Sequence, residues 1–127
     1  QNWEVLRTAT SADGVTFSAD PGYVIADGYV DPFMLRAEQG DWVLLLSTTP
    51  AAQRLPQKIF LARSEDGRTW TIDPVPLLES SDRNYLDPAA VQVGDGVWRV
   101  VLSVAARANA IEGPHAYVAA TLTETRR

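Results

Sequence analysis

Residues 64–70 read SEDGRTW, and a similar stretch, SADGVTF, lies 53 positions earlier at residues 11–17. Each stretch begins with Ser, continues through Asp and Gly, and ends with Thr and an aromatic residue. In a tight turn of this composition, the Asp carboxylate accepts backbone N–H groups and the Gly supplies a positive φ. Two copies at this separation predict a repeated structural unit.

The repetition extends beyond the two turns. The first copy runs from residue 11 to 47 and the second from 64 to 103, with three extra residues inside the second copy. A third copy of the repeat begins with HAYVAATLTE at 115–124, which aligns with KIFLARSED at 58–66. The matching positions are Ser11, Asp13, Gly14, Thr16, Asp20, Pro21, Asp31, Pro32, Gly40, Trp42, Leu46 and Ser47 with Ser64, Asp66, Gly67, Thr69, Asp73, Pro74, Asp87, Pro88, Gly96, Trp98, Leu102 and Ser103.

Short apolar runs separated by Gly, Pro, Asp and Ser dominate the rest of the chain. Their length and alternation are typical of strands, and no comparable segment has a helical period. We therefore expect an all-β fold. The predicted strands are 3–9, 17–25, 31–38, 41–49, 58–64, 69–78, 87–93, 97–104 and 116–124.

Composition restricts the classes of partner. The 127 residues suit one domain, and the formal net charge of −5, with scattered basic residues, argues against a nucleic-acid partner. No apolar run is long enough to span a membrane, so we expect no membrane partner either. Cysteine is absent and there is a single histidine, so the sequence predicts no metal site and no cofactor. No signal peptide is visible, although we favour an extracellular or periplasmic location.

A repeat of about 50 residues with four short strands has the size of a propeller blade. The two heptads resemble the Asp box of sialidase-like propellers, a turn between the third and fourth strands of a blade. The resemblance implies four-stranded antiparallel blades within a five-bladed propeller: a blade end at 1–27, a full blade at 28–80 and an incomplete blade at 81–127. We expect a piece of a longer propeller, whose remaining blades come from the same protein; the alternative is a half-ring completed by another copy.

A second resemblance concerns the two Asp-Pro pairs. YVDPFMLR at 29–36 and YLDPAAVQVGDGVWRVVLS at 85–103 resemble the innermost strands of five-bladed glycosidases of glycoside hydrolase families 43, 32 and 68. The resemblance implies that Asp31 and Asp87 face the central funnel. One would act as base or nucleophile, and the other would stabilise the transition state or tune a pKa. Which aspartate takes which role stays open.

IEGPHAY at 111–117 resembles the segment that carries the general acid in family 43, which implies a catalytic role for Glu112. In that family the segment begins an innermost strand, whereas the repeat places Glu112 in a loop between second and third strands. Tyr29, Tyr85 and His115 are the expected substrate-binding residues, since tyrosine rings stack on sugars. The alternatives are structural: Asp-Pro as a cap of a blade junction, Glu112 as an ordinary loop acid and His115 as a surface residue.

These features predict a glycoside hydrolase-like protein that acts on a carbohydrate by carboxylate acid–base chemistry. The alternative is a non-catalytic propeller fragment, or a self-assembling half-propeller, that binds glycans or proteins. A fold alone does not decide between these functions.

Overall fold

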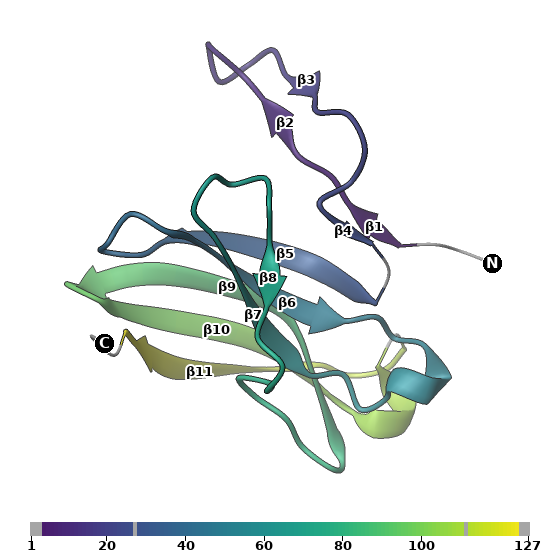
Figure 1. The fold of residues 1–127 in the computed structure, drawn as a ribbon. Coiled ribbons are helices and arrows are strands. Elements are labelled where there is room, and N and C mark those ends of the chain that lie inside the picture. The colour runs from purple at the N-terminus through teal and green to yellow at the C-terminus, as the bar shows by residue number, and fades with distance from the viewer. Residues whose placement is uncertain (1–3, 27, 111, 125–127) are drawn as a thin grey trace.

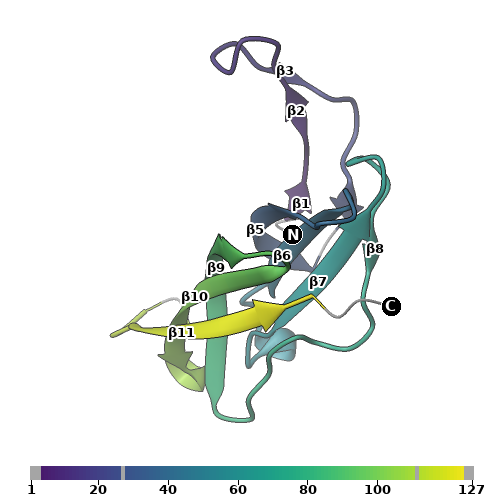
Figure 2. The same ribbon diagram turned by 90° about the vertical axis from the view of Figure 1, so that its left-hand side faces the viewer.

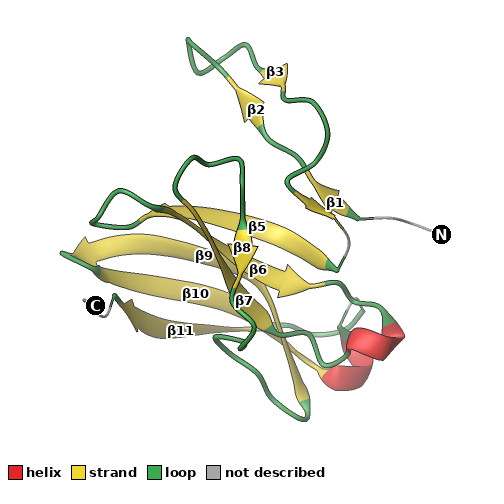
Figure 3. Cartoon of the chain, viewed as in Figure 1, coloured by secondary structure: helices red, strands yellow, loops and turns green. Residues whose placement is uncertain are grey.

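The computed structural model describes residues 4–26, 28–110 and 112–124 (Figure 1). In these residues the chain is all-β, as predicted, and its strands form several antiparallel sheets. The described helices are the short 3₁₀ turns η1 (Ala52–Arg54) and η2 (Arg107–Asn109), which lie close together at one end of the body (Figure 3). No helix in the described ranges is long and apolar enough to cross a membrane.

Two sheets form the body of the molecule. The central sheet has four antiparallel strands in chain order, and the C-terminal sheet has three, with β10 between β9 and β11. Neither sheet closes into a barrel. The central sheet contains β5 (Tyr29–Arg36), β6 (Trp42–Thr48), β7 (Ile59–Ser64) and β8 (Thr71–Ile72), and the C-terminal sheet contains β9 (Arg83–Gly94), β10 (Val97–Ala106) and β11 (Ala116–Thr123).

Residues 5–26 form a long hairpin that rises from the body (Figures 1 and 2). Its base pairs two short strands and its tip pairs two more. The turn at the tip is the first of the two repeated heptads. We call this segment the N-terminal hairpin; its strands are β1 (Val5–Leu6), β2 (Ala9–Thr10), β3 (Ser18–Ala19) and β4 (Ile25–Ala26).

The central sheet is covered on both faces. Its first face packs on the C-terminal sheet, and its second face packs on the base of the N-terminal hairpin. A strand buried on both faces needs a continuous apolar run, and β6 has one in Val43–Leu46. The inter-sheet cluster is Leu35, Ala37, Val43, Leu45, Ile59, Trp98, Val100 and Leu102, and the hairpin cluster is Ile25, Leu44, Leu46 and Ala62.

A buried amide connects the two sheets. Asn84, at the start of β9, accepts the N–H of Gln57 through Oδ1 at 2.7 Å. Its Nδ2 atom donates to the carbonyl of Ala106 at 2.8 Å. The side-chain amide of Gln57 donates from Nε2 to the carbonyl of Thr48 at 2.7 Å. Asn84 is fully buried, so these bonds fix where β9 starts relative to the end of the central sheet.

Both repeated turns have the predicted hydrogen bonds. In the second turn the Asp66 carboxylate accepts the N–H groups of Thr69 at 2.7 Å and Arg68 at 2.8 Å. Asp13 accepts the equivalent N–H groups in the first turn at 2.7 and 2.9 Å. These backbone donors, together with a serine hydroxyl, hold the pKa of both carboxyls well below the usual range.

The strand register corrects one alignment made from the sequence. Ser47 of β6 pairs with Ile59 of β7, and its counterpart Ser103 pairs with Tyr117 of β11. Tyr117 therefore corresponds to Ile59, whereas the sequence alignment placed Tyr117 opposite Phe60. The alignment of the third copy was wrong by one residue, because short apolar runs align almost equally well in adjacent registers.

Candidate functional site

The two Asp-Pro pairs form the same β-bulge in the first strands of the two sheets. Asp31 and Pro32 together oppose Leu46, between the pairs that flank them in β5 and β6. In the same way, Asp87 and Pro88 together oppose Leu102. The φ angles are 52° at Asp31 and 49° at Asp87, both in the left-handed region.

Local conformation explains part of this sequence pattern. In one class of bulge with two residues against one, the first residue lies in the left-handed region; glycine is usual there, and aspartate tolerates that region better than most other residues. Proline fits the second position, since the ladder is already interrupted there and no N–H is required. The Asp-Pro pair therefore has a structural role at both sites, whatever its chemistry.

The bulge also changes the face to which the strand directs its side chains. Tyr29, before the bulge, packs on the hairpin cluster, whereas Leu35, after it, belongs to the inter-sheet cluster. In a regular strand these two positions, which are six residues apart, would share a face, because side chains alternate with a period of two. The bulge thus allows one strand to pack on both neighbours and turns the aspartate backbone out of the ladder.

Packing of the two sheets brings Asp31 and Asp87 into one electrostatic site. Burial raises the pKa of Asp31, and the negative charge of Asp87 raises it further. The negative charge of Glu4 also raises the pKa of Asp31, but by less than the charge of Asp87 does. Asp31 is exposed overall, but the surrounding protein removes part of the water from its carboxyl, and this partial loss of hydration is the main cause of the raised pKa.

A buried serine that was not among the predicted site residues lies beside this pair. The Ser47 hydroxyl and the backbone N–H of Asp87 partly oppose the rise in the Asp31 pKa. Ser47 is fully buried, and its Oγ atom makes no hydrogen bond of ordinary geometry in the described structure. Ser103 is its buried counterpart in β10. The repeat itself was the available signal, since it matches Ser47 with Ser103.

The structure does not join Glu112 and His115 to the aspartate pair. Both are exposed in the loop between η2 and β11. No hydrogen bond, ion pair or electrostatic effect links either residue to Asp31 or Asp87 among the described contacts. The loop does open at the same end of the C-terminal sheet as the β9 bulge, because Tyr85, Val104 and Ala116 pair across one row.

The two tyrosines beside the Asp-Pro pairs are packing residues in part. Tyr29 meets Phe60 edge to face, with ring centroids 5.6 Å apart and an interplanar angle of 82°. Tyr85 packs against the inter-sheet cluster. Each ring is half-buried, so only part of it is free to contact a ligand.

In the described ranges, no three His, Cys, Asp or Glu side chains gather closely enough to hold a metal ion. The candidate site consists of Asp31 and Asp87 on their two bulges, with the hydroxyl of Ser47 beside Asp31. No protein-family model matches the chain, and no curated protein matches it.

Proposed function

We propose that this chain is part of a glycosidase-like β-propeller that acts on a carbohydrate through Asp31 and Asp87. The observation that carries the proposal is the pairing of these carboxyls, with the pKa of Asp31 raised by burial and by the charge of Asp87. Glycoside hydrolysis requires such an asymmetry: one group gives a proton to the leaving oxygen, and another remains ionised as base or nucleophile.

In this proposal Asp31 holds the proton and Asp87 is the ionised partner. Asp87 then acts on the sugar or on the attacking water, and its charge keeps the proton on Asp31 in the resting site. The Ser47 hydroxyl accompanies Asp31 and stabilises the carboxylate that remains after proton transfer. Glu112 stays a proposed third carboxylate, with His115, Tyr29 and Tyr85 as proposed sugar contacts.

The propeller assignment draws on the repeat and on the sheets. Residues 29–72 form one four-stranded antiparallel sheet in chain order, as a blade would. The C-terminal sheet packs on one face of it, and the N-terminal hairpin packs on the other. The same turn closes the last two strands of the central sheet and the N-terminal hairpin, and we assign this turn as the Asp box.

Turnover of carbohydrate substrates tests the proposal directly. The 127-residue chain and the variants Asp31→Asn and Asp87→Asn would be assayed against aryl glycosides and oligosaccharides of varied sugar and linkage. Each substitution keeps the side-chain shape and tolerates the left-handed backbone, so a loss of turnover of about 100-fold or more would reflect lost carboxyl chemistry. Asp95→Asn, at an exposed turn, is the matched control. Full turnover in both site variants would refute the proposal.

A non-catalytic role is the second candidate, and a specific observation favours it. Both aspartates already have a structural reason to be present, because each occupies a left-handed bulge position. In that case the chain would bind glycans or proteins, as a fragment or as a self-assembling half-propeller. Saturable sugar binding by calorimetry without any turnover would support binding, and a solution mass of two chains would support self-assembly.

A further inference from the structure

The two sheets differ at their last strand. In the central sheet, β7 has a partner on its outer edge: the N–H groups of Asp73 and Leu77 donate to the carbonyls of Leu61 and Ile59, each at 2.8 Å. β11 occupies the equivalent place in the C-terminal sheet and is an edge strand there. Within the described residues, no strand pairs with the outer edge of β11.

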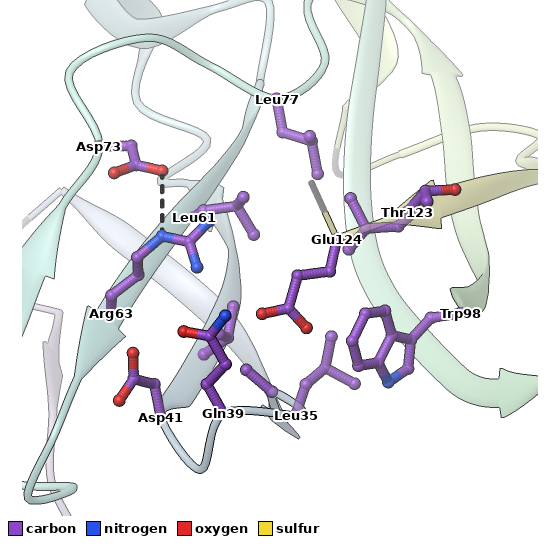
Figure 4. A pocket seen from close by; sticks show the side chains of 13 residues that line it. Leu35, Gln39, Asp41, Leu61, Arg63, Asp73, Leu77, Trp98, Thr123 and Glu124 are labelled. Carbon is purple, nitrogen blue, oxygen red and sulfur yellow. Dashed lines mark ion pairs between the residues drawn. The ribbon is translucent and has the colours of Figure 1, made fainter. Parts of the chain in front are cut away.

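A cavity of about 700 Å³ lies beside this edge, between the outer strands of the two sheets (Figure 4). Its apolar wall includes Leu61 and Leu77 on one side and Trp98 and Leu122 on the other. Glu124 extends into the opening between these walls (Figure 4). At the rim, Arg63 lies 3.8 Å from Asp73.

The repeat shows what fills the corresponding space in the central sheet. There the turn that follows β7 packs on Trp42, since a Cβ atom placed on Gly67 would lie 3.4 Å from Trp42 Nε1. Trp70 and Ile72, which come next, pack against the hairpin cluster that contains Ala62. The turn after β7, the Trp70 side chain and the short strand β8 thus complete the central sheet on the face that packs on the N-terminal hairpin.

The matched positions of the C-terminal sheet lead to the cavity. Trp98 matches Trp42, and the observed register matches Ala120 with Ala62. Trp98 lines the cavity, and Ala120, which pairs with Val100, lies on the same sheet face two register positions from Trp98. The cavity therefore lies where the counterpart of Trp70 and Ile72 would pack.

We infer that the outer edge of β11 and this cavity form a docking site for an extended peptide segment that adds as a fourth, antiparallel strand. The segment carries an aromatic residue and a β-branched residue two positions apart, as Trp70 and Ile72 are. The backbone of β11 supplies the hydrogen bonds, and the cavity supplies the apolar contact. This inference depends on the repeat and not on the chemistry of Asp31 or Asp87.

Backbone direction indicates which groups of β11 receive the segment. Ile59 and Leu61 direct their backbone groups toward the chain that covers β7. Their counterparts by register are Tyr117 and Ala119, and backbone groups point to alternate edges along an antiparallel strand. The N–H groups of Tyr117, Ala119 and Thr121 therefore face the open edge.

A synthetic peptide with the sequence of residues 64–78, SEDGRTWTIDPVPLL, is the probe, added to the full chain. We expect saturable binding, with slowed amide exchange at Tyr117, Ala119 and Thr121 measured by NMR. A peptide with Trp replaced by Ala should bind at least ten-fold more weakly. The protein variant Ala119→Pro, which removes an outward N–H, should bind the peptide at least ten-fold more weakly than the native chain does. Ala119→Ser should bind the peptide as the native chain does.

Absence of saturable binding, or equal binding to the Ala119→Pro variant when its circular dichroism is native, would overturn the inference. Amide protection confined to strands other than β11 would also overturn it. A third contrary result would be a dimer in which the β11 amides are protected and which persists when the peptide is added. Such a dimer would identify a second copy as the occupant and would overturn the inference. None of these results depends on carbohydrate turnover, so this inference and the proposed function fail separately.

Discussion

Asp31 and Asp87 adopt the same left-handed backbone conformation, with φ angles of 52° and 49°, on bulges that face buried leucines in the next strand. The negative charge of Asp87 also acts on the Asp31 carboxyl and helps to raise its pKa. Aspartate therefore meets two requirements at each position: it tolerates the left-handed backbone, and it supplies a carboxyl group. Substitutions that keep one of these properties and remove the other can separate the two roles.

The first prediction concerns the backbone at Asp31. Asp31→Gly should be more stable than Asp31→Ala by about 1 kcal/mol, because a Cβ atom is unfavourable at this φ and alanine lacks the local compensation that aspartate has. Urea unfolding followed by circular dichroism gives the difference. The same pair of substitutions at Asp87 is the matched control and should give the same order. Equal midpoints for Gly and Ala at both positions would contradict the strained bulge.

The second prediction concerns pH and stability at Asp31. Its pKa in the folded chain is raised above the ordinary 3.8, so the folded state holds this proton more tightly than the unfolded state. The free energy of unfolding therefore decreases as the pH rises from 3.8 through the folded pKa. Asp31→Asn removes this dependence and should be the more stable chain at neutral pH. The difference should shrink as the pH falls toward 3.8. A constant difference across this range would contradict the raised pKa.

The third prediction concerns the turn at Asp66. Its pKa is lowered by the N–H groups of Thr69 and Arg68, so its stabilising contribution is present above 3.8 and is lost as the pH falls below that value toward the folded pKa. Amide exchange at Thr69 should therefore stay slow at pH 3.8 and accelerate only in stronger acid. Asp66→Asn should flatten this dependence, and the turn at Asp13 should behave in the same way. Titration of the Asp66 carboxyl near its ordinary value would rule this out.

The fourth prediction compares the aromatic residues that end the two turns. Trp70 is half-buried on the hairpin cluster and donates from Nε1 to the carbonyl of Gly67 at 3.2 Å, whereas Phe17 is 62% exposed. Trp70→Ala should lower the free energy of unfolding by about 2 kcal/mol, and Phe17→Ala by less than about 0.5 kcal/mol. Chemical unfolding of both variants measures the contrast. Similar losses would mean that Phe17 packs in solution as Trp70 does.

The fifth prediction concerns the buried amide between the sheets. Asn84→Ala leaves the Gln57 N–H and the Ala106 carbonyl without their partner and should cost about 2–3 kcal/mol. The exposed Asn109 provides a control, since Asn109→Ala should change stability by less than about 0.5 kcal/mol. Thermal or urea unfolding distinguishes the two. A small effect at Asn84 would show that water replaces its hydrogen bonds.

Strand content was predictable because it depends on local pattern. Val43–Leu46 is a continuous apolar run, and the structure buries it on both faces. The hydrogen bonds of Asp66 were predictable for the same reason, since they lie within one turn. The register of β11 was not predictable to the residue, because Phe60 and Ile59 are equally good apolar matches for Tyr117.

The candidate site depended on contacts between distant segments. The sequence predicted Asp31 and Asp87 as a pair, but only the packing of two sheets shows that their charges interact. Ser47 was matched in the repeat without a role, because its burial beside Asp31 is a tertiary property. Glu112 stays a prediction, since the structure leaves it exposed in its loop.

The face change at the bulge limits how the first strand of each sheet can vary in length. Tyr29 and Leu35 serve opposite faces because one additional residue lies between them in the ladder. Regular pairing of the same residues, without a bulge, would send either the tyrosine or every later apolar side chain to the wrong side. Single insertions and deletions elsewhere in this strand should therefore be eliminated by selection, whereas loss of one bulge residue would straighten the ladder and leave every side chain on its present face.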